Sequence, residues 1–175
     1  MRPPWSCWMT PTSSRRPPSA AAAPAAFACV AALALSACQP TAPPGVNQDD
    51  LDAEIARAIG DPATCVVIGK AGSGKLLSRY NSTTVCEREL PACDAPGLIR
   101  VGKLLEKTAQ DRQARQSSCN TQADASRGVG WAAGPVAGTD LVYAAVMEGD
   151  RAFPGRMIGD RLEGVFRRSK VSKTP

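Results

Sequence analysis

The chain has 175 residues, a formal net charge of +5 and seven cysteines, but it contains no histidine. The absence of histidine excludes the Ser-His-Asp and Cys-His forms of nucleophilic catalysis and removes the commonest metal ligand. A length of 175 residues suits a single domain with a hydrophobic core of its own.

Residues 1–37 have the pattern of a bacterial lipoprotein signal peptide. They carry basic residues and no acidic one, and they end in an apolar, alanine-rich run over residues 20–37. The run leads into the tetrad LSAC at residues 35–38, which resembles the lipobox at which bacterial lipoproteins are cut and lipidated. This resemblance implies a mature chain that begins at Cys38 and holds a membrane through lipid on that cysteine.

An ordinary secretory signal with a small-residue cleavage site is the alternative. Both interpretations export the protein from the cytoplasm. With Gln39 rather than an aspartate after the cysteine, the lipoprotein resemblance favours the periplasmic side of the outer membrane.

Three further segments are expected after the signal peptide. Residues 38–48 are rich in proline and small polar residues, so they predict a flexible tether between the lipid and a folded domain. One domain is expected over residues 49–170, followed by a tail over residues 171–175. The part from Cys38 onward carries a net charge of +2, because three of the 21 basic residues and none of the 16 acidic ones precede it.

The basic stretch at residues 167–173 is typical of a solvated helix end. Contact with anionic lipid or with a cell-wall polymer is the alternative. The stretch has no interleaved aromatic residues, so it does not predict nucleic-acid binding.

Four cysteines remain after Cys38, namely Cys65, Cys86, Cys93 and Cys119. An even number in an oxidising compartment predicts two disulfides. We expect Cys86 to pair locally with Cys93, and Cys65 to pair with Cys119; a bridge between Cys93 and Cys119 is the alternative. Zinc is the rival interpretation, but the chain has neither a C-x-x-C motif after Cys38 nor a histidine, so no metal or other cofactor is predicted.

The first predicted element of the domain is a helix. Apolar residues recur at helical spacing over residues 51–59, with Asp49 or Asp50 expected as the N-cap and Gly60 as the stop.

Residues 64–69 and 75–81 predict the two strands of a hairpin with a glycine-rich turn. The same segment resembles a phosphate-binding loop from Gly69 to Lys75. However, Leu76 stands where such a loop needs Ser or Thr for magnesium, and no long helix follows. The segment therefore predicts a hairpin and no nucleotide binding.

The rest of the chain predicts a loop, two helices and three strands. The loop covers residues 83–96, and a helix capped by Asp94 is expected to begin at Ala95 or Pro96 and to reach residue 110. The later elements are strands at residues 115–121, 128–136 and 140–150 and a helix at residues 155–168. This order predicts an α+β fold, in which an antiparallel sheet of about five strands carries the N- and C-terminal helices.

The order of elements resembles the α/β half of serine β-lactamases and penicillin-binding proteins, class D enzymes in particular. The matching segments are SGKLLSRYN at 73–81, RGVGWAAGPV at 127–136, LVYAAVMEGD at 141–150 and MIGDRLEGVFRR at 157–168. The resemblance covers roughly residues 51–168. It implies a β-lactamase/transpeptidase-like sheet with the first hairpin beside the last strand.

The catalytic motifs of that family are missing. No serine is followed by lysine at the Ser-x-x-Lys spacing, and the Lys-Thr/Ser-Gly motif is absent. Two candidate nucleophiles remain. Cys93 lies near an expected helix start, where a thiolate is favoured, although disulfide pairing is the plainer interpretation. Ser118 forms a Ser-x-Asn pattern with Asn120, at a different point in the order from the family's motif.

Three hypotheses follow for the function. The first is a lipid-anchored envelope protein whose degenerate β-lactamase-like domain is a non-catalytic binding or structural module, with a cell-wall or envelope protein as partner. The second is a hydrolase of the same superfamily with an altered serine or cysteine nucleophile. The third is an unrelated profilin-like or longin-like domain that binds a protein. Similarity of fold alone does not decide among them.

Overall fold

The computed structural model describes residues 42–173, which belong to one compact unit, Gln39–Pro175. The predicted signal peptide, the lipobox and Cys38 lie outside the described residues. Within them the chain forms four helices and seven strands. In chain order these are α1 (Gln48–Ile59), β1 (Cys65–Lys70), β2 (Leu76–Tyr80), α2 (Thr83–Cys86), β3 (Leu90–Pro91), β4 (Leu98–Ile99), α3 (Val101–Asp111), β5 (Arg115–Asn120), β6 (Gly128–Pro135), β7 (Leu141–Gly149) and α4 (Gly155–Arg168).

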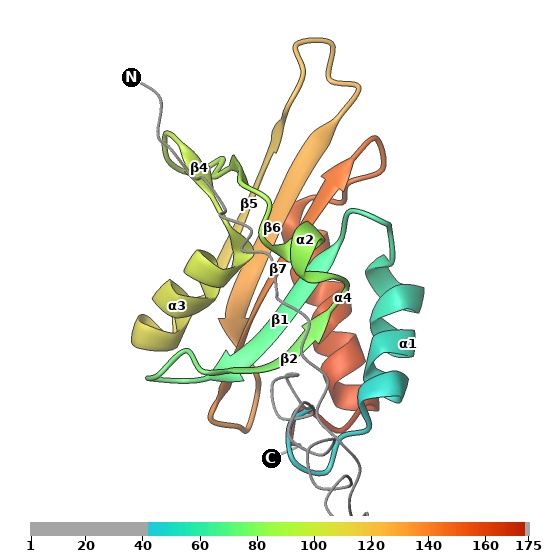
Figure 1. Cartoon of the computed structure of the whole chain (residues 1–175), viewed down its shortest axis with the longest axis vertical. Coiled ribbons are helices and arrows are strands. Elements are labelled where there is room, and N and C mark those ends of the chain that lie inside the picture. Colours follow the sequence, from blue (N-terminus) through green and yellow to red (C-terminus); the bar gives the residue numbers. More distant parts are fainter. Residues whose placement is uncertain (1–41, 174–175) are drawn as a thin grey trace, which may run out of the picture. The chain divides into compact units, whose positions relative to one another are not determined.

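Five of the strands form one antiparallel sheet in the order β2-β1-β7-β6-β5, and β3 pairs with β4 in a small separate hairpin. The expected α+β fold with a five-stranded antiparallel sheet is therefore confirmed. The β1–β2 hairpin lies beside β7, the last strand in the sequence, and β5 is an edge strand. Figure 1 shows α1 and α4 packed together on one face of this sheet and α3 on the other.

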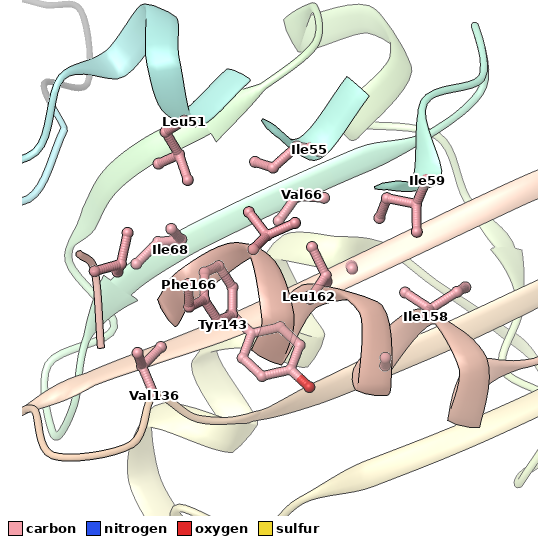
Figure 2. Close-up of a cluster of buried hydrophobic side chains, with 14 of the residues drawn as sticks. Leu51, Ile55, Ile59, Val66, Ile68, Val136, Tyr143, Ile158, Leu162 and Phe166 are labelled. Carbon is pink, nitrogen blue, oxygen red and sulfur yellow. The ribbon is translucent and has the colours of Figure 1, made fainter. Parts of the chain in front are cut away.

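The face under α1 and α4 carries the larger apolar side chains. Helix α1 contributes Leu51, Ile55 and Ile59, each four residues after the last, and all three are at most 1% exposed. Figure 2 shows them opposite the apolar stripe of α4, with Tyr143 of β7 between the helices and the sheet. The Tyr143 ring meets Phe166 edge to face at a centroid distance of 5.1 Å. Burial raises the pKa of Tyr143 to about 12.

The opposite face is covered by α3 and by the segment between β2 and α3. Alternate residues of β7 supply the two faces, because successive side chains of a strand point in opposite directions. Tyr143 and Ala145 face α4, whereas Val142, Ala144 and Val146 pack with the apolar stripe of α3. Both faces of the central strands are therefore buried, which agrees with the continuous apolar run of β7.

Three local expectations are corrected by the structure. The N-cap of α1 is Asn47, whose side chain accepts a hydrogen bond from the amide of Asp50, so neither Asp49 nor Asp50 is the cap. Asp94 caps no helix. Helix α3 begins at Val101, because residues 98 and 99 are used in β4.

The expected loop at residues 83–96 contains α2 and β3. Packing against the core also extends beyond the expected limits of 49–170. Pro43 is buried, Val46 packs on the α1–α4 core, and Val171 is only 3% exposed.

The start of α4 lies directly on the backbone of the sheet, and Gly155 makes this approach possible. A Cβ atom at Gly155 would lie 2.6 Å from the Ser117 carbonyl oxygen and 2.8 Å from its amide nitrogen. Backbone atoms of a paired strand cannot move away cheaply, so this position requires glycine.

We expect Gly155→Ala to lower the free energy of unfolding by about 1–3 kcal/mol, the usual cost of overpacking. The matched control is Gly102→Ala in α3, where an added Cβ meets nothing within 4 Å. That substitution is expected to raise the free energy of unfolding by about 0.5–1 kcal/mol, because alanine is the better helix former. Urea unfolding measures both, and equal effects would contradict the close approach of α4.

Candidate functional site

A groove of about 220 Å³ opens between the β3–β4 hairpin, α3 and the edge strand β5. Its apolar lining comes from the hairpin and from the sheet below it. Its charged lining comes from Asp94, Lys107 and Arg115. The residues that line it are Ala92, Asp94, Ala95, Pro96, Leu98, Ile99, Leu104, Lys107, Arg115, Ser117 and Trp131.

The wall formed by the β3–β4 hairpin is fastened to the sheet at three successive residues. The indole nitrogen of Trp131 donates a hydrogen bond of 2.7 Å to the carbonyl of Pro91. The Ser117 hydroxyl donates to the carbonyl of Ala92 at 3.1 Å. Cys93, the next residue, forms a disulfide with Cys119. The groove therefore has a fixed wall, and Trp131 is both its floor and one of its fasteners.

The disulfides correct the expected pairing. Cys65 pairs with Cys86 and Cys93 pairs with Cys119, so the local bridge between Cys86 and Cys93 is wrong and the alternative bridge from Cys93 is the one formed. The reason is geometric. Helix α2 turns Cys86 back onto the start of β1, whereas the β3–β4 hairpin carries Cys93 across to the edge strand β5.

The two candidate nucleophiles do not meet. Cys93 is consumed by its disulfide. Ser118 is exposed and pairs with Gly130, whereas Ser117 pairs with Trp131, so Ser118 points to the α4 face and away from the groove. Asn120 lies on the same side as Ser118 because it is two residues further along the strand.

Arg115 is the best-positioned charged group of the groove. It forms an ion pair with Asp111 in the last turn of α3, and it donates to the carbonyl of Gln113 at 2.9 Å. The hydrogen bonds from Arg115 hold the pKa of Asp111 down at about 2. Lys107 is exposed, and no salt bridge to it is found among residues 42–173, which leaves its ammonium group available to a ligand.

The apolar part of the groove is unusually open to solvent. Leu98 is 62% exposed, the largest exposed fraction among the large apolar side chains of residues 42–173. It lines the groove together with its neighbour, the half-buried Ile99, and with Trp131. An exposed leucine beside a tryptophan floor and a free lysine is an amphipathic arrangement suited to a ligand with an apolar and an anionic part.

The backbone of β5 is also open along one side. The amide of Thr121 donates a hydrogen bond to the carbonyl of Arg127, the residue before β6. Hydrogen-bonded and non-hydrogen-bonded residue pairs alternate along antiparallel strands, so Arg115, Ser117 and Cys119 are the residues of β5 whose backbone groups bond β6. The intervening residues Gln116, Ser118 and Asn120 therefore direct their amides and carbonyls away from the sheet. Such an edge can pair with an added extended segment.

The phosphate-loop-like segment forms the predicted hairpin, β1 and β2 with a turn. The amides of this turn are occupied by backbone carbonyls. Lys70 donates to Lys75, Gly74 donates to Lys70, and Gly72 donates to Ala109 of α3. A phosphate-binding loop needs free amides that converge on the phosphate. The absence of nucleotide binding stays a prediction, with a physical reason for it in the turn.

A second cluster of charged groups lies at the far end of β7. Glu148 is 6% exposed, and Arg127 and Arg88 approach its carboxylate at 2.8 and 3.1 Å. Burial raises the pKa of Glu148, but the hydrogen bonds from both arginines outweigh burial and leave that pKa below its ordinary value. The cluster links the segment after α2 to β6 and β7, so it explains how that segment is held.

Comparison of the chain with protein families, curated proteins and solved structures finds no match. Among the described residues, no helix combines the length and the apolar character needed to cross a membrane. The same residues hold no group of three His, Cys, Asp or Glu side chains that could bind a metal ion.

Sequence reasoning missed Leu98, Lys107 and Arg115 as groove residues. Leu98 was expected inside a helix, on its apolar stripe. One sequence feature indicates the position of Arg115. Asp111 lies four residues before it, a spacing at which opposite charges form an ion pair, here at the junction of α3 and β5.

We expect non-reducing peptide mapping to find the pairs Cys65–Cys86 and Cys93–Cys119. The two bridges span similar separations of 21 and 26 residues. Replacing either pair by alanine should therefore lower the free energy of unfolding by about 3 kcal/mol.

The two double variants should differ in tryptophan fluorescence. Loss of the bridge from Cys93 should change the Trp131 emission of the folded protein, because it loosens the strand that accepts the indole hydrogen bond. Loss of the bridge from Cys65 should leave that emission unchanged. A free, rapidly alkylated Cys93 in the purified protein would contradict this assignment.

Proposed function

We propose that the chain is an exported, lipid-anchored envelope protein whose degenerate β-lactamase-like domain binds a ligand in the groove without catalysing its reaction. The observation that carries the proposal is the state of the groove's hydroxyl and thiol groups. The Ser117 hydroxyl is donated to the carbonyl of Ala92, and Cys93 is bonded to Cys119. Neither is paired with a base, as an activated nucleophile would be.

The strand order agrees with the β-lactamase-like interpretation but does not distinguish it from a profilin-like or longin-like domain. The resemblance implies a first hairpin beside the last strand, and the sheet has β1 beside β7. It also implies an active-site groove beside an edge strand, and a groove lies beside β5. The residues that line the groove differ from those of the family. A hairpin held by the Cys93–Cys119 disulfide, together with Leu98, forms the wall, and the family's catalytic motifs are missing.

The lining of the groove suggests an extended ligand with an apolar group and an anionic group. Leu98 and Trp131 offer apolar contact, Lys107 offers an unpaired charge, and the open edge of β5 offers backbone hydrogen bonds. A cell-wall peptide or a segment of an envelope protein has this chemistry. An acyl-transferring hydrolase with an altered nucleophile is the alternative.

We expect a fluorescent penicillin to leave no covalent label on the denatured protein, because the groove holds no activated nucleophile. A known penicillin-binding protein, labelled in parallel, is the positive control. A labelled band that disappears in Ser117→Ala or Ser118→Ala would favour the hydrolase. Noncovalent binding is followed separately through Trp131, since Trp5 and Trp8 fall within the expected signal peptide.

In that second assay, N-acetyl-D-alanyl-D-alanine is the probe of a cell-wall peptide. It should change the Trp131 emission saturably, and Lys107→Ala should weaken the response about tenfold or more through loss of a charge-assisted contact. Lys103→Ala is the matched control, because Lys103 lies on the same helix, is exposed and pairs with Glu106. Equal responses of the two variants would remove Lys107 from the site.

The anchor is tested on the mature N-terminus. Mass spectrometry of protein isolated from bacterial membranes should find an acylated Cys38, and Cys38→Ala should release the protein into the soluble fraction. An unmodified N-terminus at another residue would leave an exported protein without a lipid anchor.

A further inference from the structure

The chain enters the folded domain beside the basic end of α4. A hollow at this point is lined by Gly45 and Asn47, which precede α1, by Arg168, the last residue of α4, and by Ser169 and Lys170, which follow α4. The two helices run antiparallel: Arg161 bonds the carbonyl of Ala58 near one end, and Arg168 bonds Glu54 nearer the other. The N-terminal entry and the C-terminal basic tail therefore share one end of the domain.

Two turns of the sheet adjoin the same end. Lys173 donates its amide to Ala137 at the β6–β7 turn, and Ala71 of the β1–β2 turn donates to Asp140 on the other side of it. Figure 1 shows both turns and the last turn of α4 at one end of the domain. We call this surface the basic end; it comprises the exposed cations Lys70, Lys75, Arg167, Lys170 and Lys173.

The basic end keeps a net positive charge when its acidic neighbours are included. Asp140 is paired with Arg112 at 3.2 Å. Glu54 is paired with Arg168 at 2.8 Å. The exposed carboxylates of Asp49 and Asp50, in the first turn of α1, and of Glu163, one turn before Arg167, offset part of the charge. None of the five cations of the basic end forms a salt bridge with a residue of the described range 42–173.

We propose that the basic end docks on a bilayer that carries anionic phospholipid. The proposal rests on the proposed lipidation for its orientation. Only four Cα steps separate Cys38 from Ala42, the first described residue, so the lipid-bearing residue can lie at most about 14 Å from it. Pro43 is buried and Val46 packs on the core, so the chain is already fixed to the domain there. A lipid on Cys38 would hold the basic end within about two Debye lengths of the headgroups.

The electrostatic contribution can be measured without the lipid. The unit Gln39–Pro175 contains both cores and both disulfides, so a chain that begins at Gln39 is a complete folding unit. This fragment should sediment with vesicles of phosphatidylcholine containing about one third phosphatidylglycerol, and not with phosphatidylcholine alone. Added salt should weaken the association, since exposed charges are screened.

Two triple variants with the same loss of charge identify the surface. Lys75→Gln, Lys170→Gln and Lys173→Gln together should weaken vesicle binding at least tenfold, because each cation near an anionic surface contributes up to about fivefold. Arg100→Gln, Arg151→Gln and Arg156→Gln together, away from the basic end, should leave it unchanged. A cooperative thermal transition for each variant shows that it is folded.

No binding of the fragment to anionic vesicles would overturn the proposal, and so would equal losses in the two triple variants. Neither result depends on Cys38. An unmodified Cys38 in cells would refute the lipid anchor but would not affect the proposal that the basic end binds anionic bilayers. Absence of vesicle binding would refute that proposal but would not affect the proposed acylation of Cys38.

Discussion

The need to cover both faces of β7 determines most of this architecture. The strand is apolar on both sides, so the sheet requires a layer on each of its faces. Helices α1 and α4 supply one layer with large aliphatic side chains at helical spacing. The other layer has only the eleven-residue α3 and the irregular segment after β2. That second layer is thin, and both disulfides are found in it.

The thin layer explains why the groove lies where it does. Helix α3 covers β1, β7 and part of β6, and it meets β5 near its own C-terminal end, where Thr108 and Asp111 contact Arg115. The β3–β4 hairpin fills the remaining width, and it is too short to pair with the sheet along its length. It is held instead by Trp131, Ser117 and the bridge from Cys93 to Cys119. A hollow remains between hairpin, helix and edge strand, with polar and apolar groups on its walls.

Local sequence patterns were enough to predict helices α1 and α4 and the β1–β2 hairpin. The i, i+3/i+4 spacing of α1 and α4 and the glycine-rich turn of the first hairpin were sufficient to place these elements, and α4 matched to the residue. The start of α3 was missed because pairing of residues 98 and 99 in β4 is a contact with a strand eight residues earlier. The N-cap of α1 was missed because Asn, Asp and Asp lie within four residues and all suit the role.

The disulfide pairing and the groove could not be predicted from the sequence for a different reason. Both depend on which segments the sheet order brings together. Once β5 is the outer neighbour of β6, Cys119 faces the hairpin that carries Cys93, and the distance along the chain no longer matters. The same order exposes one side of β5 and separates Ser118 from the groove. The two candidate nucleophiles named from sequence motifs, Cys93 and Ser118, therefore lie on opposite faces of the sheet.

The layers also separate the two proposed surfaces. The chain enters on the face covered by α1 and α4, beside the basic tail, whereas the groove belongs to the face covered by α3. The sheet lies between the groove and the part of the basic end at α4, whereas the β1–β2 turn of the basic end touches the last turn of α3 through Gly72 and Ala109. Contact of the α4 part of the basic end with a bilayer would therefore leave Leu98 and the edge of β5 open to solvent. A ligand site that had to stay accessible on a tightly anchored domain would need this separation, because a link of a few residues gives the domain little freedom to turn away from the membrane.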